Sequence, residues 1–299
     1  MLKRFWIYFK EMYPLVPRLF LAFGLFFAID FLIIANNGVK NFSIGGQEFI
    51  AILTTFSFLL ALRIADEFKD YESDKKNFPE RPLPSGRVKK SDLITLLLIF
   101  QIPTIALNLI FMNNLWWFIA LYAYGILMTF WFFAKKWIQP NLMLALITHN
   151  PVQLLLNFYI ISFICTKYGL SILTPNIILI GLALYLPGLT WEISRKIRAP
   201  KQETAYTTYS KIMGYKTATL VVVALILTST IIDTFILWRL YPLAIIVLWT
   251  LFAFVLAKSI LFIKNPAKSP YIKTTTTFIY LEQMTLLATA LIFIWMNRT

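Results

Sequence analysis

Long apolar segments recur along the whole chain, and they constrain its fold more than any other feature. Nine can be separated, at approximately 14–36, 46–66, 92–112, 114–134, 141–164, 171–193, 217–237, 241–263 and 276–296. Each is long enough to cross the hydrocarbon core of a bilayer as an α-helix, which rises about 1.5 Å per residue. The connecting segments are too short for soluble domains. The sequence therefore predicts an all-α, polytopic membrane protein with nine transmembrane helices in one domain, residues 1–299.

The composition agrees with a membrane-embedded core and excludes several kinds of site. Hydrophobic residues make up 59% of the chain, well above the roughly 45–50% of soluble domains. Cys165 is the one cysteine and His149 the one histidine. The sequence therefore provides neither a disulfide framework nor a metal centre built from several histidines or cysteines.

The distribution of positive charge predicts the orientation. Of the 28 Lys and Arg residues, 24 fall on the side of the N-terminus, and only Lys40, Lys167, Arg239 and Arg298 fall on the other. Cytoplasmic loops carry the excess of positive charge, so we expect a cytoplasmic N-terminus, with an interfacial helix in residues 1–13. The net charge of +14 indicates anionic lipids as partners, and no nucleic acid is expected for so apolar a chain.

Acidic residues concentrate after the second apolar segment. Six of the 14 acids lie between Asp66 and Glu80. Asp66, Asp70 and Asp74 are spaced so that a helix would present all three on one face, where like charges repel. One interpretation is a solvated helix end whose acids pair with neighbouring lysines. The other is a site for Mg²⁺, which takes one or two carboxylates together with substrate phosphates.

A proline-rich loop follows the acids. Residues 79–87 read Pro-Glu-Arg-Pro-Leu-Pro-Ser-Gly-Arg, and three prolines and a glycine cannot continue a helix. Arg81 and Arg87 bring guanidinium groups, whose fixed fork of donors suits phosphate oxygens. The loop favours the interpretation as a phosphate site.

These residues resemble the UbiA-type membrane prenyltransferases, whose nine helices surround a central cavity and whose N-terminus is cytoplasmic. The first signature of that family, N-D-x-x-D-x-x-x-D, is followed by R-P-[LI]-x-S-G. Here the stretch is Asp66-Glu67-Phe68-Lys69-Asp70-Tyr71-Glu72-Ser73-Asp74, and Arg81-Pro82-Leu83-Pro84-Ser85-Gly86 follows. Asp66 stands where the family has Asn. Lys135 and Lys136 look like the family's basic pair beside the diphosphate.

The second family signature, an aspartate-rich run, is altered in this chain. The corresponding segment carries Arg195, Lys196, Arg198 and Lys201, and its remaining acids are Glu192 and Glu203. In one account the basic side chains neutralise the diphosphate directly and replace one metal ion. In the other, catalysis is lost or altered and the chain binds an isoprenoid diphosphate.

The resemblance implies transfer of a prenyl group from a polyprenyl diphosphate to an aromatic or lipid acceptor in the membrane. Mg²⁺ would be held by Asp66, Asp70 and Asp74. The diphosphate would contact Arg81, Lys135, Lys136, Arg195, Lys196, Arg198 and Lys201, and the acceptor or a second site would involve Glu192, Glu203 or His149. The implied location is the bacterial inner membrane, with the site facing the cytoplasm and no obligatory protein partner.

Two other functions remain as alternatives. A terpene cyclase of the same superfamily would quench the allylic cation within its own chain and release diphosphate without an acceptor. A transporter would place charges in broken helices near the midplane, whereas the densest charge here lies at a helix end.

Overall fold

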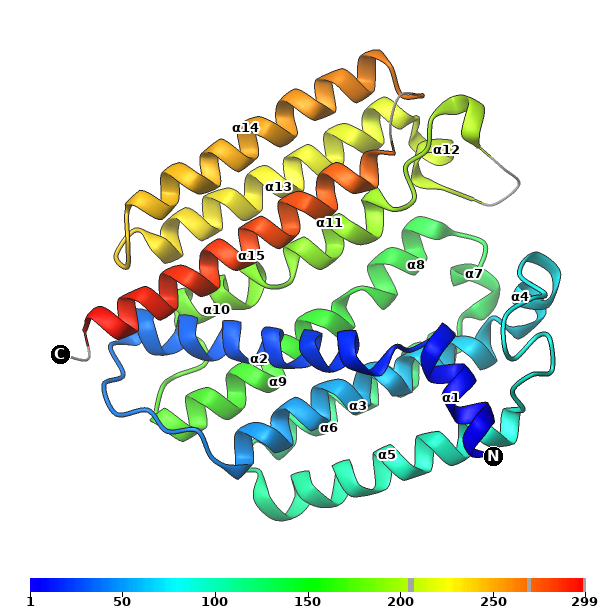
Figure 1. Cartoon of the computed structure of the whole chain (residues 1–299), viewed down its shortest axis with the longest axis horizontal. Coiled ribbons are helices and arrows are strands. Elements are labelled where there is room, and N and C mark those ends of the chain that lie inside the picture. Colours follow the sequence, from blue (N-terminus) through cyan, green and yellow to red (C-terminus); the bar gives the residue numbers. More distant parts are fainter. Residues whose placement is uncertain (204–206, 268–269, 298–299) are drawn as a thin grey trace. The chain divides into compact units, whose positions relative to one another are not determined.

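The computed structural model describes residues 1–203, 207–267 and 270–297, and every regular element in these ranges is a helix (Figure 1). Eight helical segments of the described residues are long and apolar enough to span a membrane. They are Leu15–Asn37, Gly46–Lys69, Lys90–Phe111, Leu142–Tyr168, Pro175–Ser194, Tyr215–Leu237, Leu243–Lys264 and Tyr271–Met296. The structure confirms the prediction of an all-helical, polytopic integral membrane protein.

The remaining one of the nine predicted spans, 114–134, is only partly helical. Helix α6, Leu115–Thr129, has 15 residues and is too short to be counted with the other eight. The chain then enters a short 3₁₀ turn, η1 (Trp131–Phe133), in which all three residues have positive φ. Hydropathy continues through residue 134, but the backbone leaves the α-helical region, so the apolar segment overstates the length of the helix.

Contacts divide the chain into two compact units. Unit 1 comprises Met1–Phe26 and Ser43–Gln139, and unit 2 comprises Phe27–Phe42 and Pro140–Thr299. Helix α2 (Leu15–Asn37) contributes its first part to unit 1 and the remainder to unit 2. The sequence-based assignment of one domain stays a prediction.

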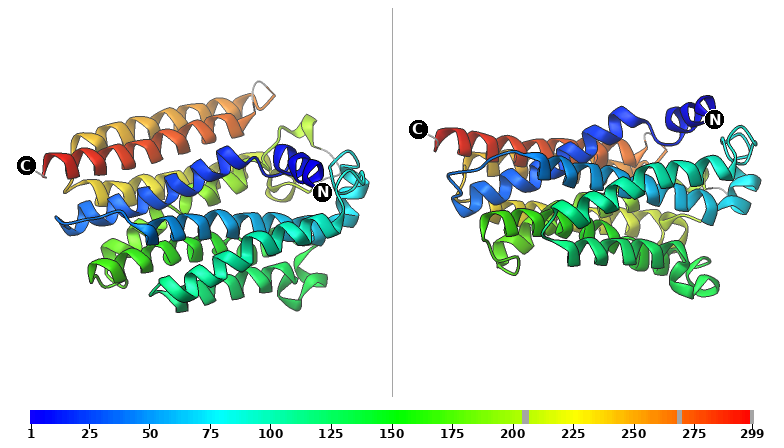
Figure 2. Two further views of the ribbon diagram at one scale, coloured as in Figure 1. Left: turned by 60° about the horizontal axis from the view of Figure 1, so that its bottom comes forward. Right: turned by 90° about the horizontal axis from the view of Figure 1, so that it is seen from below.

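Unit 1 contains the helices of the first half of the chain, except for the second part of α2. They are α1 (Leu2–Glu11), α3 (Gly46–Lys69), α4 (Tyr71–Asn77), α5 (Lys90–Phe111), α6, η1 and α7 (Lys135–Ile138). Helices α3 and α5 lie side by side (Figure 2) and are joined by buried hydrogen bonds. Asn108 Nδ2 donates to Thr54 Oγ1 at 2.7 Å, and Gln101 Nε2 donates to the carbonyl of Ser57 at 2.9 Å. Such bonds between helices satisfy polar groups that lipid cannot.

Helix α1 is attached to unit 1 along one face. Tyr8 is fully buried, and the guanidinium of Arg4 forms a two-point ion pair with the buried carboxylate of Asp92 on α5, with N–O distances of 2.6 and 2.9 Å. The opposite face leaves Leu2 and Trp6 82% and 65% exposed. Exposed apolar side chains of this kind suit contact with lipid, and the assignment of residues 1–13 as an interfacial helix stays a prediction.

Unit 2 contains the second half of the chain. Its elements after α2 are α8 (Leu142–His149), α9 (Pro151–Tyr168), α10 (Pro175–Ala183), α11 (Leu186–Ser194), η2 (Pro200–Gln202), α12 (Tyr209–Met213), α13 (Tyr215–Leu237), α14 (Leu243–Lys264) and α15 (Tyr271–Met296). Helix α13 packs against α14, α11 and α10, and α15 packs against α14 and α11. Thr275 on α15 donates to Ser194 Oγ at 2.9 Å, which joins the C-terminal end of α11 to α15.

Two of the spans in unit 2 are broken helices. Pro151 begins α9 immediately after the Asn150 junction, as expected because proline lacks the N–H that a continuous helix needs and clashes with the preceding turn. The span Pro175–Ser194 is likewise divided at Leu184–Tyr185, just ahead of Pro187.

One buried acid pair lies within unit 2. Asp233 on α13 and Glu282 on α15 are both fully buried and interact electrostatically. None of their four carboxyl oxygens has a hydrogen-bond partner of ordinary geometry among the described residues. Burying carboxyl groups away from water is costly unless they are neutralised.

Candidate active site

The acidic segment lies at the junction of two helices in unit 1. Helix α3 ends at Lys69, Asp70 is the junction residue with φ −103° and ψ 9°, and α4 begins at Tyr71. Helical hydrogen bonds nevertheless continue across the junction: Asp70 N donates to Asp66 O at 2.9 Å, and Asp74 N donates to Asp70 O at 2.8 Å. The three aspartates are thus one helical turn apart from each other although the helix is not continuous.

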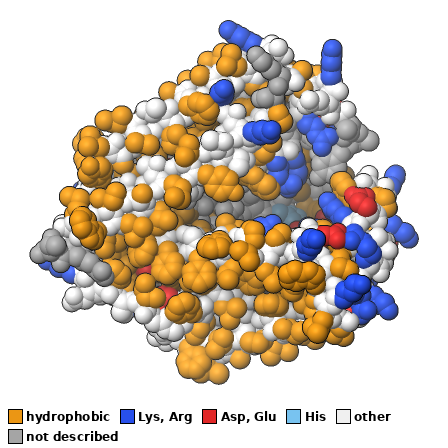
Figure 3. Space-filling model, in the orientation of Figure 1, with side chains coloured by type: hydrophobic (Ala, Val, Ile, Leu, Met, Phe, Trp, Pro, Cys, Tyr) orange, Lys and Arg blue, Asp and Glu red, His pale blue; other side chains and the backbone are white. Residues whose placement is uncertain are grey.

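We call Asp66, Glu67, Asp70 and Asp74 the acid cluster. Three of its members are paired with basic side chains of unit 1. The pairs are Asp66 with Lys69 at 3.1 Å, Glu67 with Arg63 at 2.5 Å and Asp74 with Arg81 at 2.6 Å. In Figure 3, basic and acidic side chains of unit 1 gather at the end that carries α1 and α4. Pairing with a neighbouring lysine, as one interpretation of the sequence predicted, is therefore found for Asp66, whereas Glu67 and Asp74 are buried and pair with arginines.

Asp70 differs from the other members. It is partly buried and has no ion-pair partner among the described residues. Burial raises the pKa of Asp70, Lys69 lowers it, and the neighbouring carboxylates of Asp66 and Asp74 raise it further. A partly buried carboxylate between two others is the position in this cluster where an additional cation would be most favourable.

The donor set suits Mg²⁺ in kind, and its arrangement limits how many ligands the protein supplies. Within residues 1–203, 207–267 and 270–297, no three Asp, Glu, His or Cys side chains are placed to hold a metal ion together. Mg²⁺ commonly takes only one or two protein carboxylates and completes its shell with water and phosphate oxygens. Asp66 and Asp70 fit that pattern, whereas Asp74 is occupied by Arg81. The assignment of all three aspartates as ligands stays a prediction.

The proline-rich loop holds Arg81 against the cluster. Leu83 and Val88 are buried, Val88 N donates to Pro82 O at 2.9 Å, and Ser85 Oγ donates to Arg81 O at 2.7 Å. Gly86 takes φ +75°, a left-handed conformation that glycine adopts without strain. The guanidinium of Arg81 also stacks over Phe78, 4.0 Å from the ring centroid. The loop thus orients a fork of donors beside Asp74.

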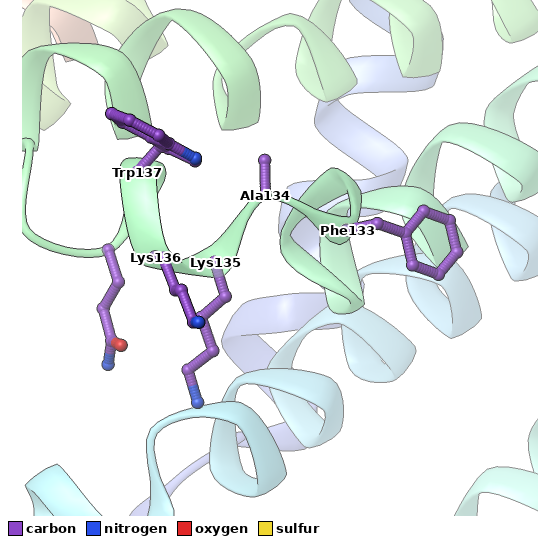
Figure 4. A pocket seen from close by; sticks show the side chains of 6 residues that line it. Phe133, Ala134, Lys135, Lys136 and Trp137 are labelled. Atoms are coloured by element: carbon purple, nitrogen blue, oxygen red, sulfur yellow. The ribbon is translucent and has the colours of Figure 1, made fainter.

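The predicted basic pair lies on α7, directly after a strained turn. Trp131, Phe132 and Phe133 have φ of 54°, 51° and 57°, and each left-handed residue with a side chain costs about 1–2 kcal/mol. Phe133, Ala134, Lys135, Lys136, Trp137 and Gln139 line an open pocket. Figure 4 shows Lys135 and Lys136 extending from α7 in a common direction, away from Trp137 and Phe133. Two ammonium groups on one side of a pocket can bind an anion.

In unit 2, the basic residues of the altered signature are partly neutralised by an acid. Glu192 accepts from Arg195 Nε at 2.6 Å and from Lys196 Nζ at 3.0 Å. Lys201 is exposed on η2, and the backbone N–H of Arg198 donates to Ser210 Oγ at 2.9 Å. Arg195 and Lys196 therefore share the carboxylate of Glu192.

The other predicted acceptor contacts have local partners. Glu203 accepts from Thr208 Oγ1 at 2.7 Å and from Ser210 Oγ at 2.5 Å. His149 ends α8, and its Nδ1 lies 2.9 Å from Thr148 Oγ1. An acceptor role for Glu192, Glu203 or His149 stays a prediction.

Sequence reasoning missed one residue of the site, Trp131, and the burial of another, Lys69. Pairing of the acids with neighbouring lysines is one of the two sequence-based interpretations, and the spacing from Asp66 to Lys69 fits it. The Lys69 side chain is, however, only 8% exposed, and its Nζ lies 4.6 Å from the ring centroid of Trp131. No local pattern marks Trp131, since its position depends on how η1 folds back against the end of α3.

Comparison with known proteins supports the fold. No protein-family model matches the chain, and no curated protein matches it by sequence. A solved structure of digeranylgeranylglyceryl phosphate synthase, a membrane protein, matches with a TM-score of 0.62 and 18% sequence identity, over 98% of this chain and 99% of that one. At this level of identity the match shows a shared fold, and that fold agrees with the resemblance expected from the sequence.

Proposed function

We propose that this chain transfers a prenyl group from a polyprenyl diphosphate to an aromatic or lipid acceptor within the membrane. The observation that carries the proposal is the acid cluster of unit 1, in which Asp70 is partly buried without a paired cation while Arg81 is held beside Asp74. A site that combines carboxylates with guanidinium and ammonium groups suits a metal–diphosphate complex. The fold shared with digeranylgeranylglyceryl phosphate synthase supports the same function.

The protein's own residues have distinct roles in this proposal. Asp66 and Asp70 would bind Mg²⁺, which when bound screens the diphosphate charge and acts as a Lewis acid. Arg81 orients Asp74 and keeps that carboxylate from repelling the diphosphate. Lys135 and Lys136 would donate hydrogen bonds to the leaving diphosphate, which stabilises the charge that develops as the allylic C–O bond breaks.

The apolar helices of unit 1 would hold the prenyl chain. Its spans Gly46–Lys69 and Lys90–Phe111 would provide the hydrophobic environment that an isoprenoid tail needs. Exclusion of water from the reacting carbon would protect the allylic cation from hydrolysis. We further propose that the acid cluster faces the cytoplasm, since most of the chain's Lys and Arg residues fall on that side.

Purified protein in liposomes, given labelled prenyl diphosphates of several chain lengths, tests the function. We expect Mg²⁺-dependent release of diphosphate that requires an acceptor, with label appearing in the acceptor. Release without an acceptor would indicate a terpene cyclase. Binding without release would indicate a non-catalytic homologue, and uptake without consumption a transporter.

A further inference from the structure

Lys69 is placed differently from the other lysines near the acid cluster. Lys75 and Lys76 on α4 are exposed, whereas the Lys69 side chain is 8% exposed. Its ammonium lies 3.1 Å from Asp66 Oδ1. A lysine pays a large desolvation cost at such a position unless it has a defined partner.

The second contact of Lys69 is with an aromatic ring. Its Nζ lies 4.6 Å from the centroid of the Trp131 ring, a geometry in which the ring's π face attracts a cation. Trp131 is the first of the three left-handed residues of η1. Backbone strain of this kind persists where the surrounding structure imposes it, and it clusters at functional sites.

The two contacts differ in how easily they can be exchanged. The ring of Trp131 holds the ammonium without using any of its three N–H donors in a directional bond. Asp66 is 41% exposed, so it stays accessible to another cation. The ammonium can therefore turn from Asp66 to a new anion while it remains on the ring.

We propose that Lys69 is a further diphosphate-binding residue, which rests on Asp66 and Trp131 until a diphosphate binds and then donates to a diphosphate oxygen. This inference rests on the proposed function and adds a residue to its site. In the absence of diphosphate, Lys69 competes with a metal ion for Asp66. When the diphosphate binds, Asp66 is released and can bind Mg²⁺, so that the metal and the diphosphate favour each other's binding.

The test uses the full chain in detergent with inorganic pyrophosphate and Mn²⁺ as probes, each measured alone. For Lys69→Met we expect pyrophosphate affinity without metal to fall about tenfold. We expect Mn²⁺ affinity without pyrophosphate, measured by electron paramagnetic resonance, to rise, because Asp66 has lost its internal cation. Lys75→Met, which removes an exposed lysine of α4, should change neither affinity.

These opposite shifts separate the proposal from a structural role. If Lys69→Met weakens both probes together, Lys69 only supports the fold, and the proposal is wrong; unchanged pyrophosphate affinity overturns it equally. Trp131→Leu should weaken pyrophosphate binding and Trp131→Phe should largely preserve it, since Phe retains the π face. Failure of the proposed function would give a different result. The wild-type protein would then not turn over prenyl diphosphate, although its pyrophosphate binding would still depend on Lys69.

Discussion

Neutralising Asp70 should stabilise the metal-free protein and should also strongly reduce the proposed prenyl transfer. In the structure, Asp70 is partly buried, lacks an ion-pair partner among the described residues and lies between the carboxylates of Asp66 and Asp74. Each like-charge neighbour at helical spacing costs about 0.2–0.5 kcal/mol. Removal of two such repulsions, less the attraction of Lys69, leaves a gain of about 0.5 kcal/mol for Asp70→Asn. The proposed prenyl transfer should fall about 10²-fold or more, because an acidic group of the proposed metal site is lost.

Asp74→Asn is the matched control and should have the opposite effect on stability. Its carboxylate accepts from Arg81 at 2.6 Å and is only 11% exposed, so the loss of this charged hydrogen bond should cost about 1–2 kcal/mol. Thermal unfolding in detergent without divalent metal, followed for both variants beside wild type, measures the difference. If Asp70→Asn lowers the melting temperature as Asp74→Asn does, the reasoning about the acid cluster is refuted.

Three further predictions concern stability outside the acid cluster. Arg4→Gln should lower the melting temperature, because Asp92 is left buried without its cation. The control Lys3→Gln should leave the melting temperature unchanged. Equal melting temperatures for the two variants would mean that the Arg4–Asp92 pair does not stabilise the protein. Glu11 has its pKa lowered by the hydrogen bond from Arg87, so it contributes stability above its ordinary pKa of 4.5 that is lost as pH falls through the lower folded value. Glu11→Gln should therefore reduce the slope of melting temperature against pH below about 4.5, and an unchanged slope would contradict this. Asp233→Asn should raise the melting temperature, because it removes one of two carboxyl groups that are buried together without a hydrogen-bond partner of ordinary geometry among the described residues; a lower melting temperature would show that the acid pair stabilises the protein.

The strongest sequence signals predicted features that depend on local composition. Membrane insertion follows from runs of apolar residues, and the structure contains eight of the nine predicted spans at the required length. The loop at residues 79–87 was also predicted, because proline acts on its own backbone, and the break at Pro151 has the same cause. The acids from Asp66 to Asp74 resembled a family signature, and the fold of the whole chain agrees with that resemblance.

Tertiary structure decided which charges meet and where helices end. Asp66 pairs with Lys69, and Arg81 with Asp74, so that Asp70 alone of the cluster lacks a cation among the described residues. Helix α6 ends at Thr129 because the next residues turn left-handed, although their hydropathy continues the apolar run. Hydropathy and helical spacing are properties of neighbouring residues, whereas the partner of Lys69 on η1 is chosen by packing between segments far apart in the chain. The sequence by itself therefore determined the class of protein and the location of its acids, and only the folded chain determined which of those acids are paired with a basic side chain.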